Sequence, residues 1–220
     1  MAVRDSVTYN LEQALTEEGC PVCRCLTTMT RRYLENLLYE FVNDPRTRDR
    51  LRASAGFCRE HAWTLQQMGD PLAHSIIYAD LIDGFCQELR KTTNASRRSI
   101  PIFHPEKAEA CPVCREETET EERYVVGLVK ALHQKAFRQK YRQGGSLCLP
   151  HFRAAYGRAR DGEVQDLLIE VELDYLSHLS GELQEFIRKS DYRYAGELPG
   201  TERDAWIRAV QLWVGPLGFK

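Results

Sequence analysis

The chain carries one cysteine–histidine pattern twice, and this duplication restricts its fold more than any other feature. Cys20-Pro21-Val22-Cys23 returns as Cys111-Pro112-Val113-Cys114, and Cys58-x-x-His61 returns as Cys148-x-x-His151, at an offset of about 91 residues. Further matches at that offset pair Arg32 with Arg123, Tyr33 with Tyr124 and Leu37 with Leu128. Because self-similarity at a fixed offset marks a repeated structural unit, the sequence predicts two tandem repeats.

Both halves have the apolar spacing of helices. Apolar side chains recur at steps of three and four residues, as on one face of an amphipathic helix, and no stretch alternates with the period of two that strands require. The expected helices are residues 26–41, 46–53, 61–68 and 71–89 in the first half, and about 112–142, one after Cys148, and 163–189 in the second half. The chain is therefore predicted to be all-α.

The duplication and the local composition divide the chain into four expected segments. These are residues 1–92 as the first repeat, 93–110 as a linker rich in Ser, Thr and Pro, 111–190 as the second repeat, and 191–220 as a C-terminal loop and helix. In the last helix, Trp206, Val210 and Trp213 share one face. We expect this face to pack on the rest of the chain, since its helix lacks the Lys/Arg cluster of a membrane-surface helix.

The duplicated residues are typical metal ligands. Zinc takes four thiolate or imidazole ligands in a tetrahedron, and a Cys-x-x-Cys pair places two sulfurs on the same side of a first helical turn. Pro is favoured at the first helical position, which makes Cys20 and Cys111 the expected N-caps of two helices. The unpaired N–H groups and the positive dipole end at such a start favour thiolates.

The eight predicted ligands form two Cys3His sets, which we expect to bind two zinc ions. The simpler grouping takes one set from each repeat: Cys20, Cys23, Cys58 and His61, then Cys111, Cys114, Cys148 and His151. The alternative grouping joins Cys20 and Cys23 to Cys148 and His151 across the repeats. An iron–sulfur cluster is the alternative cofactor, although the cysteines of ferredoxin-type clusters usually lie closer in sequence.

Several other features carry less weight. Cys25 and Cys86 fall outside the repeated pattern, and Cys86 lies on an apolar helical stripe, where a core cysteine is the ordinary interpretation. The acidic run at 116–122 suits the start of a helix, where carboxylates complement the dipole. No nucleophile–base pair, phosphate-binding glycine loop or carboxylate pair stands out, so the sequence favours a protein that is not an enzyme.

Composition and charge restrict the setting and the partners. A formal net charge of −2 gives no general attraction to nucleic acid or to an anionic membrane. The N-terminal residues have no apolar stretch of a signal peptide, and no apolar run approaches the length of a membrane span. We expect a cytoplasmic protein, in which eight cysteines indicate metal or redox chemistry rather than disulfides.

The segments CPVCR, RRYLENLLYEFVNDP and GFCREHAW, with CPVCRE and SLCLPHF in the second half, resemble an uncharacterised bacterial family, a domain of unknown function. That family is marked by doubled CPxC and CxxH motifs. The resemblance covers nearly the whole chain, including the closing ERDAWIRAVQLWVG. It implies two sites and a helical fold, and it adds no activity.

Three functions remain in competition at this level. The first is a helical binding or adaptor protein with two structural zinc ions and an unknown protein partner, favoured because both ligand sets are complete. The second is an iron–sulfur or thiol-based redox or sensor protein, since thiolates are favoured at helix starts. The third is a zinc-dependent hydrolase, which requires one site to keep a bound water.

Overall fold

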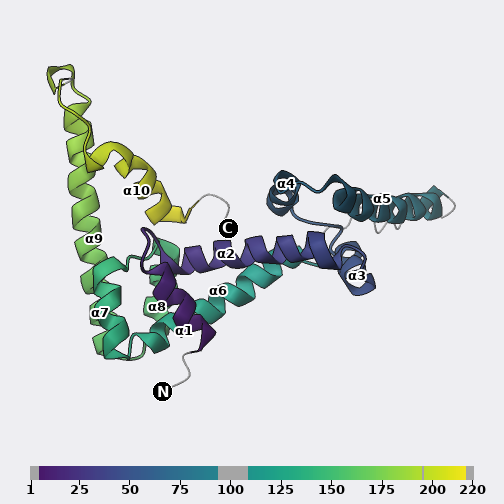
Figure 1. Ribbon diagram of the computed structural model, residues 1–220, viewed down its shortest axis with the longest axis horizontal. Coiled ribbons are helices and arrows are strands. Elements are labelled where there is room, and N and C mark those ends of the chain that lie inside the picture. Colours follow the sequence, from purple (N-terminus) through teal and green to yellow (C-terminus); the bar gives the residue numbers. More distant parts are fainter. Residues whose placement is uncertain (1–4, 94–108, 195, 217–220) are drawn as a thin grey trace. The chain divides into compact units, whose positions relative to one another are not determined.

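Every regular element in the described residues is a helix, and these residues contain no strand (Figure 1). The computed structural model describes residues 5–93, 109–194 and 196–216. The elements are α1 (Ser6–Ala14), α2 (Pro21–Asn36), the π-helical segment η1 (Leu37–Phe41), α3 (Pro45–Ala53), α4 (Arg59–Gln67), α5 (Pro71–Thr93), α6 (Pro112–Ala131), α7 (Lys135–Gly144), α8 (Leu149–Arg158), α9 (Gly162–Lys189), the 3-10 segments η4 (Tyr192–Tyr194) and η5 (Thr201–Asp204), and α10 (Ala205–Val214). The predicted all-α class is confirmed.

Helix starts follow from local chemistry. Asp5 and Asp44 cap α1 and α3 by accepting from the backbone N–H of Thr8 and Thr47, at 2.7 and 2.8 Å. α2 and α6 begin with Pro21 and Pro112, each directly after a cysteine of the repeated motif. The predicted relation between motif and helix start is therefore confirmed.

The chain forms two compact units. The first combines residues 1–27 with 120–220, and the second is residues 28–119, so the division falls inside α2 and α6. The repeats expected from sequence, 1–92 and 111–190, are defined by internal sequence similarity, whereas the two units are defined by compact packing. The repeat boundaries stay a prediction. The expected linker, 93–110, lies almost wholly outside the described residues.

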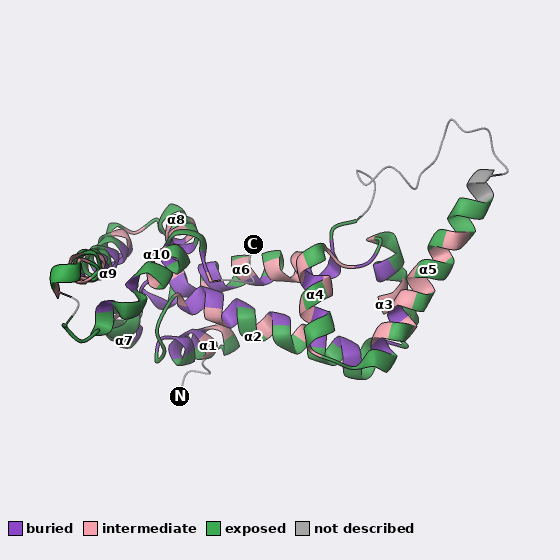
Figure 2. Ribbon diagram, turned by 90° about the horizontal axis from the view of Figure 1, so that it is seen from above, coloured by how far each residue is buried: buried purple, intermediate pink, exposed green. Residues whose placement is uncertain are grey.

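Each unit has its own core, built on one end of α2 and the opposite end of α6. In the first unit, Val22 and Leu26 near the start of α2 cluster with Val125 and Leu128 near the end of α6. In the second unit, Leu34 in the last turns of α2 clusters with residues at the start of α6, including Val113. The buried residues of both cores are purple in Figure 2.

Two details of the helices differ from the sequence-based expectation. The single helix expected over 112–142 is broken after Ala131, where Gln134 is extended, and α7 begins at Lys135. The break contains no Pro or Gly, and it lets Phe137 and Tyr141 of α7 enter the core of the first unit. Helix α1 was not expected; it is short, and Leu11 and Ala14 join that same core.

The C-terminal helix packs as expected, but with a different face. α10 lies against α9 through Ala205 and Leu212, which are buried. Trp206, Val210 and Trp213, the face expected to pack, are 54, 58 and 65% exposed, so that expectation is wrong. A small-residue face with one Leu allows close approach to α9, and this approach turns the bulkier side chains outward. Among the described helices, none combines the length and apolar character needed to cross a bilayer.

Candidate metal centres

The first candidate centre lies wholly in the first unit and joins the starts of α2 and α8. It consists of Cys20, Cys23, Cys148 and His151, whose ligand atoms lie within 4.8 Å of one another. The Nδ1 atom of His151 is 3.3, 3.2 and 3.1 Å from the sulfurs of Cys20, Cys23 and Cys148. Cys148 is the N-cap of α8, and its carbonyl accepts from Phe152, so the sulfur and imidazole follow from one helical turn.

The second candidate centre lies wholly in the second unit and repeats this plan at the starts of α4 and α6. Its members are Cys58, His61, Cys111 and Cys114. The Nδ1 atom of His61 lies 3.2 Å from the sulfur of Cys58, 3.7 Å from that of Cys111 and 3.4 Å from that of Cys114. Cys58 occupies the N-cap position of α4, as Cys148 does that of α8, and neither side chain makes a capping hydrogen bond.

All eight predicted ligands therefore take part, but the expected grouping within each repeat is wrong. The structure joins the CPVC of one repeat to the CxxH of the other, as in the alternative grouping. In the second unit, the end of α2, the start of α4 and the start of α6 share one core, so the first CxxH meets the second CPVC. Because the end of α6 packs beside the start of α2 in the first unit, the CxxH that follows α6 and α7 reaches the first CPVC.

The spacing of the ligand atoms fits one tetrahedral ion. Four ligands at zinc distances stand about 3.8 Å apart for two sulfurs and about 3.6 Å for sulfur and nitrogen. The Cys23–Cys148 and Cys58–Cys114 sulfur pairs are 3.5 and 3.6 Å apart. These separations are far above the roughly 2.05 Å of a disulfide, and all eight cysteines are free. Each set can hold a single metal ion.

A carboxylate holds the far side of each imidazole. Nε2 of His61 is 3.0 Å from Oε1 of Glu117, and Nε2 of His151 is 3.1 Å from Oε1 of Glu121. Thr30 also donates to Glu117, at 2.8 Å. A carboxylate on Nε2–H keeps Nδ1 free for a metal and raises its basicity, as is common for metal-binding histidines. Sequence reasoning missed both glutamates, because it assigned the whole acidic run to the helix dipole.

Two titrating groups of the second centre shift in opposite directions: Cys111 toward the thiolate that binds metal, and His61 toward the imidazolium, which has to lose its proton before it can bind metal. Burial raises the pKa of Cys111, but hydrogen bonds from His61 and from backbone N–H groups outweigh it and lower the pKa to about 6. Burial likewise opposes the rise for His61, but Cys111 and Glu117 raise its pKa to about 10. At neutral pH the set therefore favours a Cys111 thiolate hydrogen-bonded to a protonated His61. A cation that binds there replaces these protons, so binding releases them to solvent.

The pKa shifts in the first centre have the same directions, with the histidine raised and one cysteine lowered. Burial lowers the pKa of His151, but hydrogen bonds with Cys148, Cys20 and Glu121 outweigh it and raise the pKa to about 12. Burial raises the pKa of Cys20, but the neighbouring thiols and His151 bring it well below its ordinary value. Hydrogen bonding to Cys148 and Cys20 raises the pKa of Cys23. The set therefore favours one thiolate and one imidazolium. A metal that binds there would displace the protons that the imidazole and the remaining thiols carry.

A buried carboxylate fixes the loop that leads into the first centre. Glu172 of α9 is 5% exposed, and its Oε2 accepts from the backbone N–H of Leu147 at 3.1 Å. Burial raises the pKa of Glu172 to about 7, against the effect of that hydrogen bond. Leu147 directly precedes Cys148, so the contact orients the start of α8.

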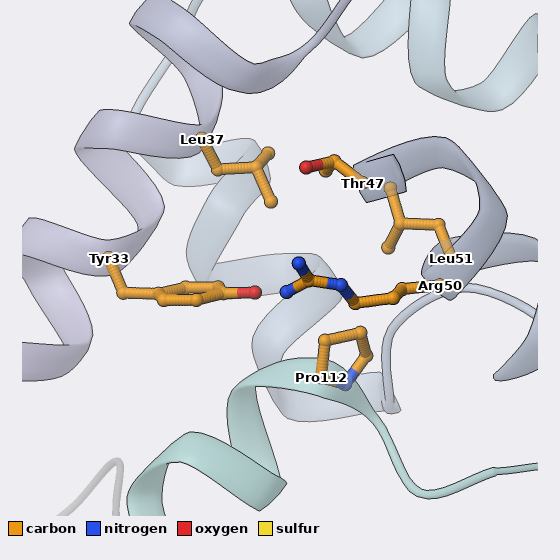
Figure 3. Close-up of a pocket in the computed structure, with 6 residues that line it drawn as sticks. All are labelled: Tyr33, Leu37, Thr47, Arg50, Leu51 and Pro112. Carbon is orange, nitrogen blue, oxygen red and sulfur yellow. The ribbon is translucent and has the colours of Figure 1, made fainter. Parts of the chain in front are cut away.

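The remaining candidates stay outside both centres. Cys25 is buried in the core of the first unit, and burial raises the pKa of its thiol to about 12. Cys86 is half-buried on α5 and joins neither set. A small pocket beside the second centre contains none of the proposed ligands. It is lined by Tyr33, Leu37, Thr47, Arg50, Leu51 and Pro112, and the Tyr33 hydroxyl points toward the Arg50 guanidinium (Figure 3).

The fold and the two sets define the class: an all-helical protein with two Cys3His groups that can bind metal. The chain belongs to a family of unknown function, DUF6062, which residues 6–218 match. It is similar to an uncharacterized 23.9 kDa protein in the xynA 3' region of Caldicellulosiruptor sp. (strain Rt8B.4). The two are 27% identical over 206 residues, which cover 90% of this chain and 96% of the relative. No solved structure matches the chain.

The grouping across the repeats has a direct test in paired substitutions. Cys20→Ser with Cys148→Ser removes two ligands from one centre, so we expect the double variant to keep one of two metal ions. Cys20→Ser with Cys58→Ser removes one ligand from each centre and should weaken both. Metal content after dialysis against a chelator distinguishes them. The reverse result, with the first variant losing both ions, would restore the grouping within each repeat.

The two carboxylates should strengthen the centres selectively. Loss of a carboxylate that orients a metal-bound histidine typically weakens binding by about 10–100-fold. We expect Glu117→Ala to weaken zinc binding at the second centre and Glu121→Ala at the first, in chelator competition. Glu119→Ala, an exposed change on the same helix, is the matched control. Equal affinities for all three variants would show that the carboxylates do not support the imidazoles.

Proposed function

We propose that the protein binds two zinc ions, one per centre, and that both ions are structural. The observation that carries this proposal is the closed Cys3His set in each unit, with all four ligand atoms placed around one point. A structural zinc site has four protein ligands, whereas a catalytic site keeps a position for water. The sets therefore favour a stabilising role over a zinc-dependent hydrolase.

The same compactness favours one ion over a cluster. Ligands of a multi-iron cluster bind different iron atoms and must stand further apart than ligands that share one ion. Here the four atoms of each set lie within 4.8 Å. Zinc is preferred over a single iron because thiolate and imidazole in a tetrahedron suit zinc without any redox change.

Anaerobic purification followed by metal analysis and a visible spectrum tests this proposal. We expect a colourless protein with about two zinc ions per chain, which loses thermal stability when a strong chelator removes them. Stability should return when zinc is added back. A brown protein with bound iron would favour the redox alternative. A full metal load whose removal leaves the melting temperature unchanged would contradict a structural role.

The second part of the proposal is a binding or adaptor role in the cytoplasm, with a protein partner on α10. The exposed side of this helix is mostly apolar, with Gln211 as its exposed polar residue: Trp206, Ile207, Val210, Trp213 and Val214 are each at least 42% exposed. Contiguous exposed apolar patches mark interaction sites, and Trp is enriched among residues that dominate binding energy. The partner should present an apolar groove to this helix.

The charges of α10 favour a protein over a membrane. Arg208 is the cation of this helix, and it donates to Glu182 at 2.6 Å and to Asp204 at 2.9 Å. A helix that lies on an anionic membrane needs free cations on its polar side. The formal net charge of −2 gives nucleic acid no general attraction either.

A photoreactive residue in place of Trp213 of the full-length protein tests the surface in cells. We expect one cross-linked protein, and its purified form should bind the unsubstituted chain saturably. Its affinity for the double variant Trp206→Ser with Trp213→Ser should be at least about tenfold lower. Tyr39→Ser with Leu72→Ser, two exposed apolar residues of the second unit, should leave affinity unchanged. Self-association abolished by the Trp changes would replace the partner with a second copy. Flotation with anionic vesicles would instead indicate a membrane.

A further inference from the structure

The duplication provides a matched pair of sulfur contacts, one in each centre. Cys23 and Cys148 lie 3.5 Å apart in the first centre. Their counterparts in the other motif copies, Cys114 and Cys58, lie 3.6 Å apart in the second centre. The two contacts join equivalent atoms at nearly equal distance, so a difference in their surroundings can be compared directly.

Their exposure differs. Cys23 and Cys148 are each 3% exposed. Cys58 and Cys114 are both only half-buried. In the first centre the chain after α10 contributes cover: Gly215 has a φ of +89°, and a Cβ built on it would stand 3.9 Å from the sulfur of Cys23. This segment, part of 191–220, lies outside the duplication and approaches the Cys23–Cys148 pair, while Cys20 of the same centre is half-buried.

We propose that the second centre is an oxidant-responsive zinc site, whereas the first is a permanent one. The inference rests on the proposed zinc binding. Hydrogen peroxide is the oxidant: one metal-bound thiolate attacks a peroxide oxygen, forming a sulfenic acid and releasing hydroxide. The second thiolate then attacks that sulfur and displaces hydroxide, so two thiolates and one peroxide give one disulfide and two hydroxide ions.

The Cys58–Cys114 pair suits this step. Its two sulfurs have to approach by about 1.5 Å to reach disulfide length. Both belong to the starts of helices, α4 and α6, where thiolates are favoured. Disulfide formation removes two of the four ligands, and the ion is left with Cys111 and His61, too few to hold it. Zinc release from the second centre follows.

The test uses the full-length protein loaded with two zinc ions, with Cys86→Ser to remove the half-buried thiol outside both centres. Peroxide is added in small excess, zinc release is followed with a chromogenic chelator, and disulfides are mapped by mass spectrometry. We expect one ion per chain to leave at least about tenfold faster than the other, together with a disulfide between Cys58 and Cys114. Reduction and added zinc should restore the original load.

Several results would overturn the inference. Release of both ions at one rate, loss of the first centre's ion first, or a first disulfide between Cys23 and Cys148 would each contradict it. The double variants that keep one centre provide a second readout: Cys20→Ser with Cys148→Ser should stay sensitive to peroxide, and Cys58→Ser with Cys111→Ser should resist it. A protein that contains no zinc before peroxide is added contradicts the proposed function instead, so the two failures are distinguishable.

Discussion

The structure depends on the meeting of two helix starts at one point, which happens once in each unit. Each start brings a sulfur from its N-cap position and a second ligand three residues later, in a region where backbone N–H groups favour negative charge. Without a cation such a set favours a single thiolate paired with the imidazolium, because several charged thiolates in contact would repel one another. A dication removes this repulsion and fixes the directions of four chain segments. The centre in the first unit thereby joins residues 131 positions apart, Cys20 and His151.

The identities of the ligands were predictable from the sequence, but their grouping was not. Spacing and the Pro after the first Cys identify helix starts, because these are local properties of a few residues. Both groupings use the same eight residues, so local pattern is equally consistent with either. The choice follows from which end of α6 packs with the start of α2, and this depends on tertiary packing, as in the core that contains both Val22 and Leu128. The break between α6 and α7 at Gln134 was not predicted for the same reason, because no Pro or Gly marks it in the sequence.

The glutamates beside the imidazoles illustrate a second limit. An acidic run near a helix start is expected from the dipole alone. Glu119 and Glu122 of this run are exposed, and Glu122 pairs with Arg158. Glu117 and Glu121 differ because they are four residues apart and share one side of α6, and only the tertiary fold decides that a histidine faces that side. Their counterparts in the first repeat are Leu26 and Thr30, so the duplication has kept the ligands and changed their supports. Thr30 nevertheless contributes, by donating to Glu117.

With zinc bound as proposed above, the two units would not depend on it equally. Among the described residues, the first unit has the larger buried core, which draws on six of its helices from α1 to α9. The second unit's core is smaller, and it includes Cys111 among its buried members, with Cys58 and Cys114 packed against it. A small core supplies little stability by itself, so an ion that crosslinks α4 to the start of α6 contributes a larger share there. Loss of that ion should therefore loosen the second unit while the first keeps its packing. A half-buried ligand pair in the unit with the smaller core is the arrangement by which a local chemical event at two sulfurs would change the fold of one part of the chain.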